Sequence, residues 1–149
     1  MITRLKHTLL LLLSALALTA TAQSVTPTVK AYIEPDSILI GDHFTLTIDV
    51  EKDQVQNIFF PAFQTGEQPA AEDGMPQFGV LECLDDHPVD TVEHKGRRLH
   101  LRKRYTLTVF DEGIYNLGRP SVIYADKNIV DTLYGTVDSL RLFVNTFKI

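Results

Sequence analysis

The chain has 149 residues, 22% of them charged, and a formal net charge of −5 at pH 7. Its length suffices for one domain with a core of its own, and its acidic balance argues against general nucleic-acid binding. Cys83 is the single cysteine, which excludes an internal disulfide, so apolar packing must hold the fold together.

Residues 1–22 have the three-part pattern of a secretory signal peptide. Basic residues come first, an apolar run covers residues 9–18, and the small-x-small motif Ala20-Thr21-Ala22 follows. The run is about half the ~20 residues that a membrane-spanning helix needs. We therefore expect export to the periplasm with cleavage near Ala22. The remaining domain, 23–149, would carry a formal charge of 12 − 19 = −7.

Beyond this segment, short runs of β-type pattern follow one another with turns between them. Residues 44–50 alternate apolar and polar side chains, which puts one face in a core and the other in water. Residues 64–77 combine glycine, proline and acids, and we expect a surface loop there. The predicted strands are 30–34, 37–40, 44–50, 55–60, 78–84, 89–94, 97–110, 114–117, 121–124, 129–133 and 139–145.

The longest predicted strand, 97–110, follows a hairpin. Lys95-Gly96 is typical of a two-residue turn and would place His94 opposite Arg97. Along the strand, apolar residues alternate with basic and polar ones. Lys103 breaks this alternation, which predicts either a bulge or the open end of a sandwich.

The most specific local signal lies just after that strand. Asp111, Gly113 and Tyr115 have the Asp-x-Gly-x-Tyr spacing of the tyrosine corner of immunoglobulin-like domains. There the hydroxyl bonds to a backbone carbonyl just upstream, and glycine permits the bend. Together with many short strands, this predicts an all-β, immunoglobulin-like two-sheet antiparallel β-sandwich in which Tyr115 is structural.

Several segments resemble the BatD-type oxygen-tolerance proteins of bacterial aerotolerance operons. The resemblance is carried by VKAYIEPD (29–36), IGDHFTLT (40–47), LRKRY (101–105), GIYNLG (113–118) and YAD (124–126). Proteins of that family have several sandwich domains and usually a C-terminal membrane helix, so the chain would correspond to an N-terminal domain without the anchor. The resemblance implies a scaffold or partner role beside a MoxR-type ATPase and von Willebrand A-domain proteins, with no catalytic residues.

No reactive constellation stands out in the sequence. His87, His94 and His100 lie near acids, but without the spacing of metal ligands, and no nucleophile or phosphate-binding motif is present. We therefore expect no catalytic residue, no metal and no cofactor. Cys83, within the apolar stretch 80–84, is predicted to be a small buried hydrophobe. The alternatives for Cys83 are a reactive thiol or pairing between chains.

Basic residues gather around the predicted hairpin turn: Lys95, Arg97, Arg98, Arg102, Lys103 and Arg104. Period two puts Arg98, Arg102 and Arg104 on one face, with each two-residue step covering about 7 Å. Such a stripe can attract an acidic partner, and these three arginines are the candidate partner-binding residues. The alternative is a solvated strand whose charges pair with Glu93 and its neighbours.

These features predict an exported, non-catalytic protein-interaction domain whose partner is a cell-envelope protein and not a nucleic acid. The alternative is a cell-surface ligand- or carbohydrate-binding adhesin module, which usually needs exposed aromatics. The chain has no Trp, and we expect Phe59, Phe60, Phe63 and Phe78 to serve as core and loop anchors. A small redox or metal protein that uses Cys83 and the histidines is a third hypothesis.

Overall fold

The computed structural model describes residues 25–62, 81–135 and 139–147. Within these ranges all regular elements are strands, which confirms the all-β prediction, and no helix is present that could cross a membrane. The predicted signal peptide and the predicted loop 64–77 lie outside the described residues. The strands are β1 (Thr28–Glu34), β2 (Ser37–Leu39), β3 (His43–Asp53), β4 (Asn57–Phe59), β5 (Glu82–Asp86), β6 (Asp90–Lys95), β7 (Arg98–Thr108), β8 (Gly113–Gly118), β9 (Ser121–Asp126), β10 (Ile129–Tyr134) and β11 (Leu140–Asn145).

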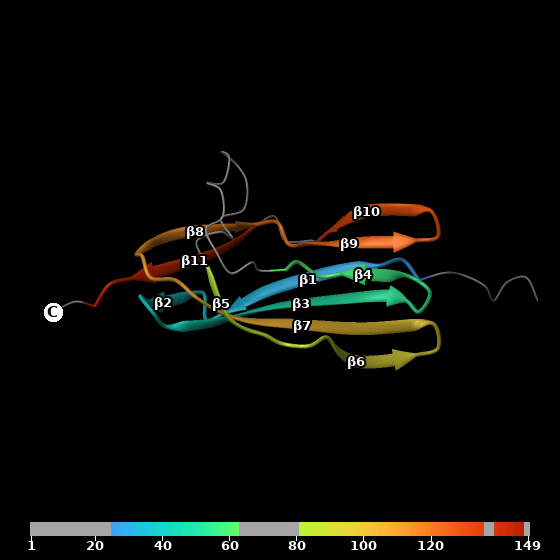
Figure 1. Ribbon diagram of the computed structural model, residues 1–149, viewed down its shortest axis with the longest axis horizontal. Helices are drawn as coiled ribbons and strands as arrows, with labels where there is room; N and C mark the ends of the chain where they lie inside the picture. The colour runs from blue at the N-terminus through green and yellow to red at the C-terminus, as the bar shows by residue number, and fades with distance from the viewer. Residues whose placement is uncertain (1–24, 63–80, 136–138, 148–149) are drawn as a thin grey trace, which may run out of the picture.

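The strands form one large sheet and two small ones, an arrangement consistent with a β-sandwich. The large sheet has the order β1-β3-β7, and both β5 and β6 pair with the far side of β7. The small sheets have the orders β10-β9-β4 and β2-β11-β8. In Figure 1, the pairs β9–β10 and β8–β11 lie end to end above the large sheet.

Two details of the pairing differ from the predicted two-sheet antiparallel arrangement. β2 runs parallel to β11, whereas every other described pair is antiparallel. The layer above the large sheet is divided because Pro120, between β8 and β9, has no N–H group to donate to a ladder. The carbonyl of Pro120 accepts from the N–H of Gly135 at 2.7 Å, which extends the β9–β10 ladder by one position beyond the pair of Ser121 and Tyr134.

The core lies between the layers and is built by the alternation predicted for β3. Phe44, Leu46 and Ile48 are at most 2% exposed. Phe60 packs against this core, but Phe59 is 57% exposed, so its predicted place in the core is wrong. Phe63 and Phe78 lie outside the described residues. The buried apolar residues are Val29, Ala31, Ile38, Phe44, Leu46, Ile48, Val50, Leu81, Tyr105, Leu107, Val109, Leu117, Val122, Leu142 and Val144.

The β6–β7 hairpin exists, but its predicted register is wrong. The turn consists of Gly96 and Arg97, and Lys95 pairs with Arg98. His94 therefore does not face Arg97. Gly96 has a φ of 56°, and a two-residue hairpin turn of this kind favours glycine at its first position. The predicted turn would have placed Lys95 there, where its Cβ would be strained.

Lys103 lies opposite a break in the neighbouring edge of the sheet. β7 pairs with β3 through Lys103 without a bulge, while β5 ends at Asp86 and β6 begins at Asp90. The irregularities in register belong to β5 and β6, so the bulge predicted in β7 is wrong. The Lys103 ammonium donates to the carboxylate of Asp86 and to the carbonyl of His87, and lies 5.2 Å from the centre of the Tyr105 ring. The methylene chain of Lys103 and its paired ammonium group thus occupy the break.

Candidate interaction surfaces

The outer face of the large sheet carries charges in rows that cross the strands. Lys30, Asp49 and Arg102 occupy paired positions on β1, β3 and β7. Asp90 of β6 pairs with Arg102 on the other side. Charges of opposite sign therefore alternate along this row, the arrangement that cross-strand pairing favours.

The three arginines singled out from the sequence lie on β7, and each has an acid beside it. Their partners are Glu51 for Arg98 at 3.7 Å, Asp49 for Arg102 at 2.8 Å and Asp90 for Arg104 at 3.2 Å. The acids come from the strands on both sides of β7, not from Glu93, which pairs with Lys95 at 2.9 Å. This face is a set of ion pairs and not a bare positive stripe, so it would attract an acidic partner less strongly than unpaired arginines.

Asp49 is the centre of the best-formed of these pairs. Its two carboxylate oxygens accept from Nε and Nη2 of Arg102 at 2.8 and 3.0 Å, and Nε2 of His100 lies 3.5 Å away. Burial raises the pKa of Asp49, but Arg102 and His100 outweigh burial and lower it. A hollow of about 370 Å³ beside it is lined by Thr28, Val29, Lys30, Asp49, Glu51 and His100.

Arg97 has a structural role at the end of β3. Its guanidinium lies 3.1 Å from the carboxylate of Asp53, which is fully buried. That carboxylate also accepts from the backbone N–H groups of Val25 at 3.1 Å and Val55 at 3.2 Å. Burial raises the pKa of Asp53, but these N–H groups and Arg97 outweigh burial and lower the pKa below its ordinary value. The carboxylate therefore stays charged. Arg97 therefore ties the hairpin turn to β3.

The histidines do not converge on a common point. His87 Nε2 lies 3.0 Å from the hydroxyl of Thr106, and His94 Nε2 lies 3.0 Å from the carbonyl of Gly96. His100 faces Asp49. Within residues 25–62, 81–135 and 139–147, no group of three or more His, Cys, Asp or Glu side chains could hold a metal ion.

Cys83 lies on β5, half-buried against the core. Burial raises the pKa of its thiol, and the nearby carboxylate of Asp86 raises it further. A raised pKa reduces the fraction of thiolate, which is the nucleophilic form. These surroundings are those of a small packing residue and do not activate the thiol.

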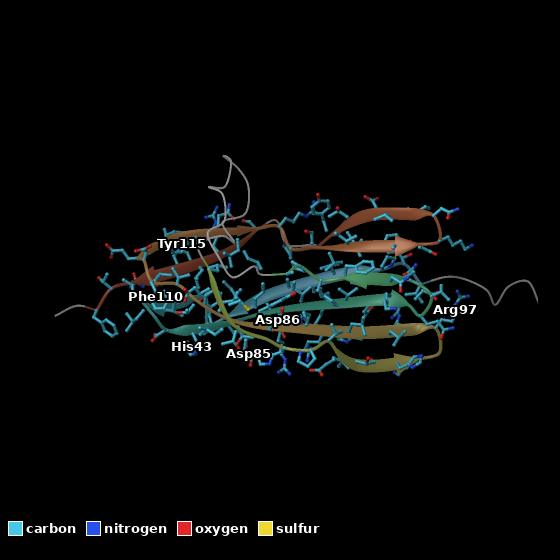
Figure 2. All side chains as sticks on the ribbon, viewed as in Figure 1. His43, Asp85, Asp86, Arg97, Phe110 and Tyr115 are labelled. Carbon is cyan, nitrogen blue, oxygen red and sulfur yellow. The ribbon has the colours of Figure 1, made fainter. Side chains whose placement is uncertain are left out.

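Asp111, Gly113 and Tyr115 form one hydrogen-bonded corner at the start of β8. The Tyr115 hydroxyl donates to the carbonyl of Asp111 at 2.8 Å, the bond that the Asp-x-Gly-x-Tyr spacing predicts. Gly113 has a φ of 148°, a backbone conformation that a residue with a Cβ rarely adopts. Figure 2 shows Tyr115 and Phe110 at the same end of the molecule, away from Arg97.

The outer face of the sheet β2-β11-β8 exposes an apolar pair beside the polar pair of Arg141 and Asn116. Ile114 of β8 pairs with Phe143 of β11, and these side chains are 67% and 40% exposed. Farther along, Phe147 is 67% exposed and lines an open hollow of about 510 Å³. The other residues that line the hollow are Leu39, Glu112, Asn145 and Thr146.

The outer face of β10-β9-β4 also exposes apolar side chains, together with the polar Asn57, Ser121 and Thr132. Phe59 of β4 pairs with Ile123 of β9, with exposed fractions of 57% and 48%. On β10, Val130 and Tyr134 are exposed, and the guanidinium of Arg119 lies 5.2 Å from the Tyr134 ring centre. Sequence reasoning missed both surfaces. The unbroken apolar run in β9, residues 122–125, was the available signal, because such runs are typical of strands covered on both faces.

No protein-family model matches the chain, and no curated protein sequence matches it. Functional inference therefore depends on the residues and their arrangement. Two kinds of surface are present among the described residues. One is the ion-paired face of the large sheet, and the other is the apolar outer face of the small sheets.

Proposed function

We propose that the chain is an exported, non-catalytic protein-interaction domain of immunoglobulin-like type. The strand orders β1-β3-β7-β5 and β4-β9-β10 support this assignment, because they correspond to the A-B-E-D and C-F-G orders of immunoglobulin domains. The hydrogen bond from Tyr115 to Asp111, at the start of β8 and just before β9 in the chain, supports it too. The signal-peptide pattern of residues 1–22 supports export.

The observation that carries the proposal is the exposed apolar pair of Ile114 and Phe143 on the outer face of β2-β11-β8. The outer face of an antiparallel sheet is normally polar, and a contiguous exposed apolar patch marks an interaction site. Ile114 and Phe143 are neighbours across two strands, and Phe147, beyond the end of β11, is exposed and lines the open hollow. Large aromatic side chains of this kind are enriched in the buried centres of protein interfaces.

The partner we propose is a protein of the cell envelope. This choice rests on the export signal and on the resemblance to the BatD-type oxygen-tolerance proteins, which are thought to serve as scaffolds beside von Willebrand A-domain proteins. Glu112, at the rim of the hollow, would contact a polar or basic group that surrounds the apolar anchor of such a partner. The alternative contact surface is formed by Arg98, Arg102 and Arg104. Their side chains remain 58%, 34% and 51% exposed beside their acidic partners.

The test compares two variants of the tagged full chain in pull-downs from cell-envelope extract. Ile114→Ser/Phe147→Ser changes two side chains that are each 67% exposed, so folding should be preserved and partner recovery should be lost. Arg98→Glu/Arg102→Glu/Arg104→Glu is the matched control, and it should retain the partner. Loss in the arginine variant alone would assign binding to the large sheet. Equal recovery by both variants and the parent would reject both surfaces.

A further inference from the structure

β10 is an edge strand whose other side has no hydrogen-bonded neighbour among the described strands. It pairs with β9 only, in an unbroken register from Ile129 to Tyr134. Val130 is 72% exposed and Tyr134 is 54% exposed. Figure 1 shows β10 at the upper margin of the molecule, with β9 beneath it. Such an edge offers unpaired N–H and C=O groups to another chain.

Two other edges, β6 and β1, carry features that discourage pairing, and β10 has fewer of them. β6 has an irregular register between Thr91 and Glu93 and is charged at both ends. β1 is followed directly by Pro35. β10 contains no proline and no basic residue. The N–H of Thr132 donates to the side chain of Asp131 at 2.7 Å, so it lies outside the β9 ladder and is available for exchange.

We propose that β10 pairs antiparallel with β10 of a second copy of this chain, about a two-fold axis at Thr132. In this register Thr132 faces its own copy, and Val130 of each chain faces Tyr134 of the other. Thr–Thr pairs and pairs of an aromatic with a β-branched residue are favourable opposite each other in sheets. A two-fold axis makes every such contact occur twice, as a self-complementary interface requires.

The charges on β10 and beside it favour a second copy over an unrelated strand. An axis at Asp131 would bring two carboxylates face to face, whereas an axis at Thr132 sets each Asp131 opposite Leu133. Arg119 lies against Tyr134, and the residue opposite Tyr134 is Val130 of the second copy, next to Asp131 of that copy. Arg119 therefore faces an uncharged side chain of the second copy, and no charges of like sign are brought face to face in this register.

Pairing would also join the outer face of β10-β9-β4 in one copy to the same face in the second copy. The row Phe59–Ile123–Thr132 already crosses β4, β9 and β10, and it would continue through Thr132 of the second copy into the same row in reverse. The resulting sheet would have three strands from each chain. This association does not depend on the proposed hetero-partner, because the face β2-β11-β8 remains free in the pair.

A cysteine on the axis tests the register directly. The full chain with Cys83→Ala and Thr132→Cys should form a disulfide-linked dimer on mild oxidation, because directly opposed Cα atoms lie about 5.5 Å apart, within disulfide range. Cys83→Ala with Thr91→Cys places the thiol on the exposed edge β6 and is the matched control. Failure of Thr132→Cys to link faster than Thr91→Cys overturns the proposed register.

Sedimentation of the purified full chain through a dilution series tests the association itself. We expect a monomer–dimer equilibrium that Val130→Lys weakens by about tenfold, because it puts a cation opposite Tyr134 beside Arg119. Val92→Lys, at a 46% exposed site on β6, should leave the equilibrium unchanged. A chain that stays monomeric at every concentration, or two variants that act alike, overturns the proposal. Neither result bears on the envelope pull-down, so the two proposals fail separately.

Discussion

The outer face of the large sheet and the outer faces of the small sheets expose different kinds of side chain to water. On the large sheet, charges of opposite sign pair across strands, as Asp49 and Arg102 do. On the small sheets, apolar side chains such as Ile114 and Phe143 are exposed. The inner faces of both layers are apolar, so folding does not require this difference. We infer that contacts with other molecules account for the apolar faces.

The largest expected effect separates the inner and outer faces of one strand. Leu117 of β8 is fully buried, and Leu117→Ala should lower the free energy of unfolding by about 2–5 kcal/mol. Ile114→Ala, at a 67% exposed site on the same strand, should lower it by less than about 1 kcal/mol. Denaturant titration of both variants measures the two values. Similar losses would mean that Ile114 belongs to the core and not to an interaction surface.

A second prediction concerns the pH dependence of the ion-paired face. The pKa of Asp49 in the folded chain is below its ordinary value of 3.8, so its contribution to stability is present above that value and is lost as the pH falls through the lowered pKa. Asp49→Asn should therefore lower the melting temperature at neutral pH, and the difference from the parent should shrink below about pH 4. Asp36→Asn, at an exposed bend, is the control for the loss of a surface carboxylate.

The smallest expected effect concerns an exposed member of the same face. Arg98→Gln removes an ion pair with Glu51 at 3.7 Å, in which both side chains are largely in water. The free energy of unfolding should change by about 0.5 kcal/mol or less, since exposed pairs contribute little. Thermal melts at low and high salt provide the measurement. A clear salt-sensitive loss would show that the charged rows act as a cooperative network.

The positions of the strands could be predicted because their signals are local. Residues 129–133 and 121–124 were expected as strands, and β10 and β9 cover them. Pairing was harder to predict because it depends on which residue occupies each turn. The hairpin register failed by one step because glycine is needed first in that turn, and the prediction placed Lys95 there.

The candidate site was predictable only in part. Alternation placed Arg98, Arg102 and Arg104 on β7, but their acidic partners come from β3 and β6, which no local pattern identifies. The exposure of Phe59 was missed because an aromatic residue beside Phe60 is expected in a core. Which of two adjacent apolar residues faces inward depends on how the strand is packed against the other layer, and that information is not in the strand itself.

The divided edge formed by β5 and β6 affects the tendency of the protein to aggregate at high concentration. Ordered aggregates grow when strand after strand stacks along a straight, uninterrupted template. On the β7 side of the large sheet, an incoming chain meets two short strands with irregular registers and the Lys103 side chain across the break. This side therefore offers a poor template for fibre growth.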